Sequence, residues 1–370
     1  MSTFKVPVTT IQDILPHPNA DRLSVAKIYD WMVVIQKDLY KVGQPIIYIP
    51  VDSILPVDLE EKLFPPDSKI KLTKSRVKSI KIRGAISQGM IVDLHHTGLV
   101  IDKNCKLEED VSSILQVKKY EPAKESLPSK LNVKKSKKQS NRYFCKYTDI
   151  ENIKWYNNLF TENEPVVMTT KLHGTNARYG WVPFDANTLY RKILKFFGFL
   201  PKWQFVWGSH NVQIHDKSEH KGFYEEDVYS KIFRQYNLDA KIPEGYVVYG
   251  EIVGDGIQKN FNYGCARGEY KLYIFDIMFV DEDGTHKYLD HWDFIDMAER
   301  MELPVVPIVY VGPFNINQAN ILVGQNPLSN ETNEGLVIKS INEKISPIGR
   351  KIVKMINPDY YLLKNGTEFH

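Results

Sequence analysis

The stretch VVMTTKLHGTNAR, residues 166–178, decides how the larger part of this chain folds. A run rich in β-branched residues ends on Lys171, a short turn with one glycine follows, and an apolar run resumes at Tyr179. This pattern predicts a strand, a tight turn and a second strand. A strand-end lysine beside Gly174, which allows close backbone approach, is suited to attack on a phosphate-bearing ligand.

Four further apolar runs carry polar residues at their centres or ends, and each predicts a strand. Two of them contain a glutamate next to a glycine, one contains a phenylalanine whose flat ring could stack on a base, and the last carries two lysines. In chain order the runs are YVVYGEIVG at 246–254, KLYIFDI at 271–277, NEGLVIK at 333–339 and KIVKMI at 351–356.

Each of these polar residues also has a purely structural interpretation when it is taken alone. A strand-end lysine is usually a solvated charge, a glutamate can be an edge carboxylate, and Phe275 would more often belong to a core. His173 could serve only to bond its own turn. The ordered set on successive predicted strands favours chemistry over these alternatives.

The ordered set resembles the motifs of covalent nucleotidyltransferases, the superfamily of polynucleotide ligases and RNA capping enzymes. The first motif, Lys-x-His-Gly-x-Asn, resembles ATP-dependent RNA ligases of the Deinococcus RNA ligase type, which are related to phage RNA ligase 2. The resemblance covers residues 141–370 and rests on five residues in chain order, Lys171, Glu251, Phe275, Glu334 and Lys354.

The resemblance implies ATP and Mg²⁺ or Mn²⁺ as cofactors. Lysine is protonated at neutral pH, so the metal and partial burial would have to favour the neutral amine. Lys171 would then attack the α-phosphate of ATP, release pyrophosphate and carry AMP through a phosphoramide bond. AMP would pass to an RNA 5′-phosphate, and a neighbouring 3′-OH would displace it. The expected partner is RNA, or an RNA-containing duplex, with a nick to be sealed.

The resemblance also assigns roles to individual residues. Lys354 would contact the α-phosphate, and Glu251 and Glu334 would organise metal water and ribose. Independently of the resemblance, we expect Glu334 to be a solvent-lined carboxylate that adds little stability. His173 would matter most after the lysine has been adenylylated. Phe275 would cover one face of the adenine, and the rest of the expected nucleotide-binding set consists of Gly174, Asn176, Arg178 and Lys339.

Two positions depart from the family pattern. The strand after the first motif often supplies an arginine, but this chain has WGSHN at 207–211, where His210 is a weak candidate for that role. The last motif usually holds Lys-x-Lys on one strand face. Here Ile352 occupies the first of these positions, and Lys351 faces the other way.

The expected fold class is α+β, with an amino-terminal OB-like β-barrel before an ATP-grasp-like nucleotidyltransferase domain of antiparallel sheets with flanking helices. The expected domains are 1–120, a basic linker at 121–140, and 141–370. Short strands are predicted at 26–28, 32–35, 45–49 and 89–92, and core-covering helices at 225–236 and 292–301.

Seven basic residues occur between Lys69 and Arg83 without one acid. On a bent strand or hairpin such a run would follow a phosphate backbone, which suits an oligonucleotide-binding barrel. A solvated sheet edge explains the run equally well. The expected linker holds eight Lys against two Glu between Lys118 and Lys138, which also fits a solvated tether.

Composition excludes some classes and leaves others open. The net charge of +3 is too small to establish nucleic-acid binding, and the three cysteines have neither disulfide nor zinc spacing. His95 and His96 lack ligand partners at useful spacing and are expected at the surface. No apolar run reaches membrane-spanning length, so we expect an intracellular, soluble, monomeric protein, cytoplasmic or nuclear, without a membrane partner.

Two other functions compete with RNA ligation. DNA ligases and capping enzymes normally append an oligonucleotide-binding domain after the last motif, and only 16 residues follow Lys354 here. A non-catalytic RNA-binding protein built on an inactive ligase domain is the second alternative. Its signal would be loss of the lysine or of either glutamate, and all three are present.

Overall fold

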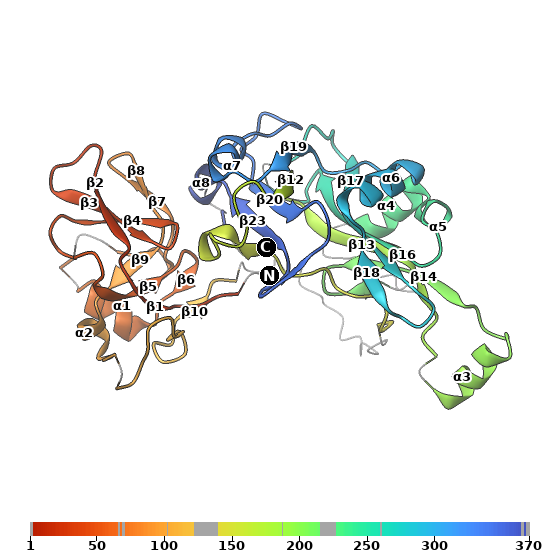
Figure 1. Cartoon of the computed structure of the whole chain (residues 1–370), viewed down its shortest axis with the longest axis horizontal. Coiled ribbons are helices and arrows are strands. Elements are labelled where there is room, and N and C mark those ends of the chain that lie inside the picture. The colour runs from red at the N-terminus through yellow and green to blue at the C-terminus, as the bar shows by residue number, and fades with distance from the viewer. Residues whose placement is uncertain are drawn as a thin grey trace. The chain divides into compact units, whose positions relative to one another are not determined.

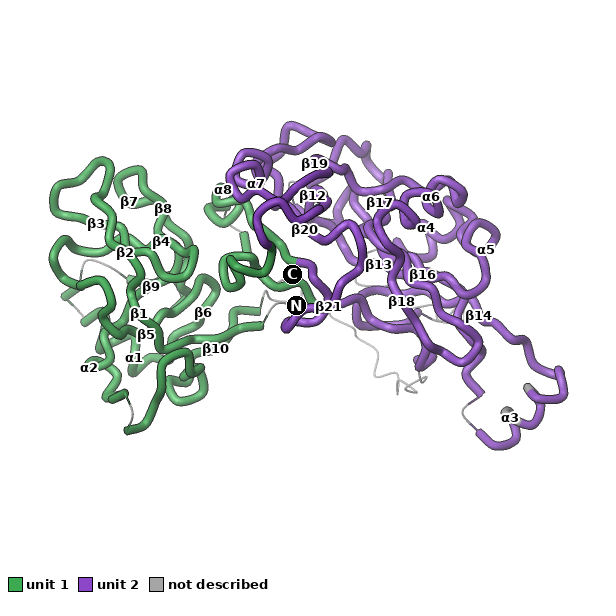
Figure 2. The backbone as a smooth tube through the Cα atoms, viewed as in Figure 1, with its two compact units in different colours: residues 1–123, 149–160, 353–370 green, residues 124–148, 161–352 purple. Residues whose placement is uncertain are grey.

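The computed structural model describes most of the chain as two compact units (Figure 2). One unit consists of residues 1–123, 149–160 and 353–370, and the other of 124–148 and 161–352. The expected domain boundaries stay a prediction, and residues 122–139 of the expected linker lie outside the described part. The described residues are 3–65, 67–68, 71–101, 103–121, 140–186, 188–214, 227–259, 261–363 and 366–367.

The first unit begins with small antiparallel sheets. One has the order β1 (Val8–Thr10), β5 (Pro45–Ile49), β9 (Met90–Val92), and a second the order β2 (Asp13–Pro16), β3 (Leu23–Ile28), β4 (Trp31–Gln36). Two further pairs are β6 (Ser53–Ile54) with β10 (Lys118–Lys119), and β7 (Ile80–Ile82) with β8 (Ala85–Ser87). The four short strands predicted in this region are confirmed.

The strands of the expected OB-like barrel form small separate sheets, and the barrel is not closed in the described residues. β6 pairs with β10 over two residues, with one further bridge from Ile54 to Arg76, and β7 pairs with β8 over three residues. The core is nevertheless continuous: Val8, Ile47 and Val92 pack with Leu59 of α1 (Val57–Leu63). His95 and His96, on α2 (Leu94–Thr97), are exposed as predicted.

The rest of this unit comes from later parts of the chain. β11 (Glu151–Asn152) pairs in parallel with β23 (Ile352–Ile356), and the short helices η1 (Ile153–Trp155) and α8 (Pro358–Tyr361) follow these strands. The Asn152 side-chain amide donates to Oη of Tyr361 over 3.2 Å.

The basic run of the first unit is not one solvated edge, because Arg76 is buried. Its Nε donates to Oδ1 of Asp52 over 2.9 Å, its Nη2 donates to the Gly366 carbonyl over 2.9 Å, and its guanidinium lies 3.6 Å from the ring centroid of Tyr120. Arg76 is therefore a structural residue and cannot follow a phosphate backbone. Lys69 lies outside the described residues, whereas Lys71, Lys74 and Arg83 are exposed.

The second unit contains a six-stranded antiparallel sheet. Helices α4 (Val228–Tyr236) and α6 (His291–Arg300) cover one face, with α5 (Leu238–Lys241) beside them (Figure 1). Both predicted helices are thus present, although residues 225 and 226 lie outside the described part. The strand order is β15 (Gln213–Ile214), β14 (Trp203–Ser209), β13 (Thr175–Pro183), β16 (Tyr246–Gly254), β17 (Tyr270–Val280), β18 (His286–Tyr288).

Strand alternation separates this sheet's two faces. Ala177 and Tyr179 of β13 face the helices and pack in a core with Ile232 and Phe294. Asn176 directly precedes Ala177 in β13, so its side chain faces the other side of the sheet, where the candidate site lies.

A second sheet of this unit has the order β20 (Gly335–Ser340), β12 (Pro165–Lys171), β19 (Ile308–Pro313), with α7 (Ile316–Leu322) following β19. Residues 172–174 carry the chain from β12 into β13 and so link the two sheets. The strand, turn and strand predicted from residues 166–178 are all present. A small hairpin, β21 (Ile345–Ser346) with β22 (Gly349–Arg350), follows β20.

One helix stands apart from both sheets. α3 (Leu189–Phe196) is inserted between β13 and β14, on an extension that leads away from the six-stranded sheet (Figure 1). Within the described part of the chain, no helix is both long enough and apolar enough to cross a membrane.

Candidate active site

Lys171, the last residue of β12, forms an ion pair with Glu334. The register pairs Lys171 with Gly335 of β20, so Glu334 precedes that strand at the end where Lys171 lies. Nζ of Lys171 is 2.6 Å from Oε1 of Glu334, and the side chains are 22% and 1% exposed. The expectation that Glu334 lines solvent is therefore wrong: the strand register buries the carboxylate, and the amine remains accessible.

The turn after Lys171 requires a glycine because the backbone of β16 passes close to it. A Cβ on Gly174 would lie 2.3 Å from the Ile252 carbonyl oxygen and 2.9 Å from Cγ of Glu251. The Gly174 N–H donates to Oε1 of Glu251 over 3.1 Å. Asn176 pairs with Glu251 in the β13–β16 register. The turn thus brings the second predicted glutamate to the site of the first.

His173 is buried in this turn as a neutral ring. Its backbone N–H donates to Oη of Tyr263 over 2.7 Å, and its ring meets Phe261 edge-on with 4.6 Å between centroids. Burial and the charge of Lys171 lower the pKa of His173 to about 3. Nδ1 lies 3.8 Å from Oε2 of Glu334, which is not an ion pair when the ring is neutral.

Burial raises the pKa of the Glu251 carboxyl to about 8, opposed by the positive charge of Lys171 and reinforced by the negative charge of Glu334. A cation that bound Glu251 would compete with a proton for the carboxyl oxygens. The charges of Lys171 and Glu334 therefore both act on the protonation of Glu251.

We expect Glu251→Gln to remove part of the pH dependence of thermal stability. Below pH 4.5 both the folded and the unfolded chain carry the proton, so this contribution to stability is fully present. Between pH 4.5 and about 8 the unfolded chain releases the proton while the folded chain retains it, so stability falls. The melting temperature of the unchanged protein should fall more steeply across this window than that of the variant. Equal slopes would contradict the raised pKa.

Asn176 is positioned to bind a ligand, whereas Arg178 already has partners in the fold. Oδ1 of Asn176 is buried, and no hydrogen-bond donor reaches it among the residues that the structure describes. Arg178 donates from Nη1 to the Phe144 carbonyl over 2.6 Å and from Nε to the Ser209 carbonyl over 2.9 Å. It holds the segment before β11 against β14, and its contact with a nucleotide stays a prediction.

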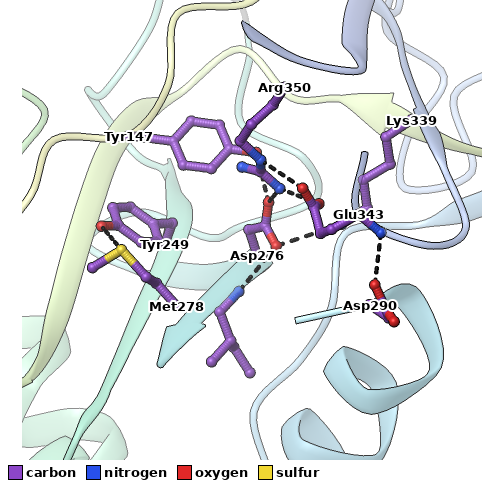
Figure 3. Close-up of polar contacts among 9 residues, drawn as sticks. Tyr147, Tyr249, Asp276, Met278, Asp290, Lys339, Glu343 and Arg350 are labelled. Carbon is purple, nitrogen blue, oxygen red and sulfur yellow. Dashed lines mark hydrogen bonds and ion pairs between the residues drawn. The ribbon is translucent and has the colours of Figure 1, made fainter. Parts of the chain in front are cut away.

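A buried ionic network surrounds Asp276, the residue that follows the predicted adenine platform Phe275 (Figure 3). Asp276 is fully buried and accepts from Nη2 of Arg350 and from Oη of Tyr147, both over 2.8 Å, and Nζ of Lys339 lies 3.5 Å away. Although burial alone would raise it, the charges of Lys339 and Arg350 lower the pKa of Asp276. Arg350 also pairs with Glu343.

Phe275 is held in place by this network. It is partly exposed, and the ring of Tyr147 meets it edge-on with 4.9 Å between centroids. Tyr147 is in turn fixed by its hydrogen bond to Asp276. Lys339 was predicted to bind the nucleotide, but the structure places its ammonium in the network, near the ring of Phe294 as well.

Lys354 and His210 complete the predicted set. Lys354 is buried in β23 and pairs with Asn152 in register, in the first compact unit, whereas Lys171 and both glutamates belong to the second. Its contact with a phosphate stays a prediction. Burial lowers the pKa of His210 to about 4, so the ring is neutral at pH 7. Lys351 has the expected separate environment, with Nζ 2.7 Å from Oε2 of Glu164.

The carboxylates fit a divalent metal that is shared with a substrate. In the described part of the chain, no group of three or more His, Cys, Asp or Glu could hold a metal by itself. Mg²⁺ is commonly bound by one or two carboxylates together with water and substrate phosphates. Oε2 of Glu334 is buried, and no hydrogen-bond donor reaches it within the described ranges. A cation would compensate this oxygen and the carboxylate of Glu251.

Sequence reasoning did not single out Tyr147, Tyr263, Asp276 or Arg350. Tyr147 and Arg350 lie outside the five motifs, and only the three-dimensional structure shows that they contact Asp276. Asp276 follows Phe275 inside an apolar run, where a charged residue at a buried strand position needs a partner. That observation could have predicted the network, but not its members.

Comparisons with known proteins identify a family and a shared fold. Residues 164–356 match the family model for RNA ligase, and residues 5–94 match an OB-fold domain model. Among solved structures, a mutant of Naegleria gruberi RNA ligase with ATP and Mn is 20% identical, with a TM-score of 0.72 over 97% of this chain and 98% of that one. The same ligase with PPi is 19% identical, with a TM-score of 0.70 over 97% and 98%. At this identity the structures show a shared fold.

Proposed function

The chain belongs to the RNA ligase family, and on that premise we propose that it is an ATP-dependent ligase that works through a covalent AMP adduct on Lys171. It would seal an RNA 5′-phosphate to a 3′-OH at nicks in duplexes, as in RNA repair. The observation that carries the proposal is the partly exposed side chain of Lys171, which is paired with the buried Glu334. The turn that follows Lys171 also contacts Glu251, through the Gly174 N–H.

The first step is attack of Nζ of Lys171 on the α-phosphorus of ATP. A nitrogen–phosphorus bond forms, the bond to the bridging oxygen breaks, and pyrophosphate leaves with the electron pair. Nζ must have lost a proton beforehand, because an ammonium has no lone pair. Glu334, 2.6 Å away, holds the amine in place and is the nearest group that can accept that proton.

The other residues of the site bind and orient the nucleotide. Glu251 and Glu334 would hold the divalent metal, which supplies positive charge against the phosphate oxygens. Oδ1 of Asn176 is available to accept a hydrogen bond from the nucleotide. Phe275 presents a partly exposed ring for the adenine. Support for ATP and a metal also comes from the similar Naegleria gruberi ligase, which has been solved with ATP and Mn.

In the second step AMP passes from Lys171 to the RNA 5′-phosphate, and in the third the 3′-OH displaces AMP. Each step breaks one bond to phosphorus and forms another, so no redox partner is needed. His173 lies near the carboxylate that holds the amine of Lys171, with Nδ1 3.8 Å from Oε2 of Glu334, and as a neutral ring it contributes no charge to the site.

We expect His173→Ala to impair joining more than self-adenylylation, by about tenfold or more in the ratio of the two rates. The neutral ring has no required task when Lys171 attacks ATP, but it belongs to the turn after Lys171 and lies near Glu334, the partner of the amine that would carry AMP. Transfer of labelled AMP to the protein and transfer from isolated adduct to nicked RNA would be measured separately. Equal loss in both steps would refute this division.

The proposal is tested by incubating the chain with α-labelled ATP and Mn²⁺ and then adding nicked duplexes. We expect label on the protein, competition by ATP but not by GTP or NAD, and sealing when the 3′-OH end is RNA. Label from GTP would indicate a capping type of enzyme, and sealing of DNA ends alone would indicate a DNA ligase. RNA binding without label would identify an inactive RNA-binding relative.

The amino-terminal unit is proposed to bind the nucleic acid. Its support is the OB-fold match at residues 5–94 together with the exposed Lys71, Lys74 and Arg83. Arg76 has no part in this, because its guanidinium is used to hold Asp52 and Gly366.

A further inference from the structure

The inserted helix α3 exposes an unusual amount of apolar surface for its length. Large apolar side chains in α3 and the three residues after it are mostly solvent-exposed. They contribute to no described core, because the extension carries them away from the six-stranded sheet (Figure 1). The exposed fractions are 76% for Leu189, 70% for Tyr190, 47% for Ile193, 86% for Phe196, 65% for Phe197 and 74% for Phe199.

This surface does not serve the catalytic turn. β13 begins at Thr175, directly after the turn, and ends at Pro183, from which the extension leads to α3. A strand of nine residues spans about 30 Å at roughly 3.3 Å per residue. α3 therefore lies beyond the opposite end of β13 and cannot cover Lys171 as a lid.

The sequence of the α3 segment carries charges of one sign. Between Asp185 and Lys202 it contains Arg191, Lys192 and Lys195 and no acidic residue. The helical period of 3.6 residues groups the exposed positions 189, 193 and 196 along one side of α3. A short helix with exposed apolar and aromatic residues, in a sequence that is basic and contains no acid, is typical of segments that lie in a membrane interface.

We propose that α3 and residues 197–199, together the α3 surface, bind the surface of a bilayer that contains anionic lipids. The aromatic and aliphatic side chains would enter the headgroup boundary, and the basic residues would meet the negative lipid headgroups. This goes beyond ligation and does not depend on it. It also replaces our expectation of no membrane partner, which considered only spanning segments.

Two other occupants explain the observations less well. RNA would account for the basic residues and the phenylalanines, but Leu189 and Ile193 have no flat surface on which a base can stack. A groove on a partner protein would cover the apolar residues, but it would not explain why the charged residues of this segment are all basic. An anionic bilayer accounts for both features together.

The test is sedimentation of the full chain with phosphatidylcholine vesicles, with and without phosphatidylserine. We expect binding that needs phosphatidylserine and weakens with added salt. Phe196→Ser combined with Phe199→Ser should lower the partition coefficient at least about tenfold. Lys192→Gln and Lys195→Gln should each lower it about fivefold. Ile345→Ser, at an exposed position elsewhere in the same unit, is the matched control and should leave binding unchanged.

The serine variants should fold normally, because both phenylalanines are largely exposed, and an unchanged thermal transition would verify this. Vesicle binding that is absent, or equal in the unchanged and doubly substituted chains, would overturn the proposal. So would a drop in RNA affinity of the double variant without a change in vesicle binding, which would make the α3 surface an RNA contact. Conversion of a dimer to a monomer by the same substitutions would identify a self-association surface instead.

Discussion

Replacing Lys171 by alanine is expected to abolish the covalent AMP adduct and to reduce RNA joining by at least about a thousandfold. The reason is that Lys171 ends β12 beside Glu334, with Nζ 2.6 Å from Oε1, and among the residues that the structure describes it is the lysine paired with that carboxylate. Label transfer from α-labelled ATP and sealing of nicked RNA would both be measured.

Lys202→Ala is the matched control for this prediction. Lys202 is 72% exposed and pairs with Glu282 over 3.1 Å. The substitution therefore removes a lysine of the same unit from a surface position. Its label transfer and joining should match those of the unchanged chain. A Lys171→Ala variant that still carries AMP in an acid-labile bond would show that another residue is the nucleophile.

Asp276→Ala is expected to cause the largest loss of stability, about 3–5 kcal/mol in the free energy of unfolding. The substitution removes the anion that Arg350 and Lys339 share, both of which are 8% exposed, and leaves Arg350 with Glu343 alone. It also removes the acceptor of the Tyr147 hydroxyl, which positions Phe275. The midpoint of urea unfolding, compared with that of the unchanged chain, would measure the effect.

Glu302→Ala is the control for Asp276, because it breaks an ion pair of similar length at the surface. Glu302 is 78% exposed and lies 2.7 Å from Nζ of Lys241. Its loss should cost far less stability than the loss of Asp276, because solvent screens an exposed pair. If Asp276→Ala were no more destabilising than Glu302→Ala, the buried network would not contribute to stability as argued here.

The centre of the site was predictable from sequence because it is encoded by local pattern. β-Branched residues before Lys171, a glycine in the turn and an apolar run after it specify two strands and the residue between them. The order of the later motifs then indicated which residues approach the turn. The structure brings Glu251 and Glu334 to the turn, through the registers Asn176 with Glu251 and Lys171 with Gly335.

The buried charges were not predictable, because their partners are distant in sequence. Arg76 lies in a run that resembles an exposed basic edge, and only the fold brings Asp52 and Tyr120 to it. Glu334 was expected at a solvent-lined position, yet the strand register buries it. In both cases the sequence shows a charge but not the desolvation that decides its role.

The amino-terminal barrel and α3 show the same limit at a larger scale. Strand positions followed from alternation, but whether strands close into a barrel depends on long-range pairing that alternation does not specify. α3 was not predicted, because its apolar residues suggest a core helix until the fold shows that they are exposed.

The central claim is that Lys171 carries AMP during the reaction. The most direct test is to incubate the full chain with ATP and Mn²⁺, digest it under conditions that preserve phosphoramide bonds, and locate the adenylyl group by mass spectrometry. The account predicts one adenylyl group on the peptide that contains Lys171, and its loss when nicked RNA is added. An unmodified Lys171 in a preparation that joins RNA, or an adenylyl group on another residue, would contradict it.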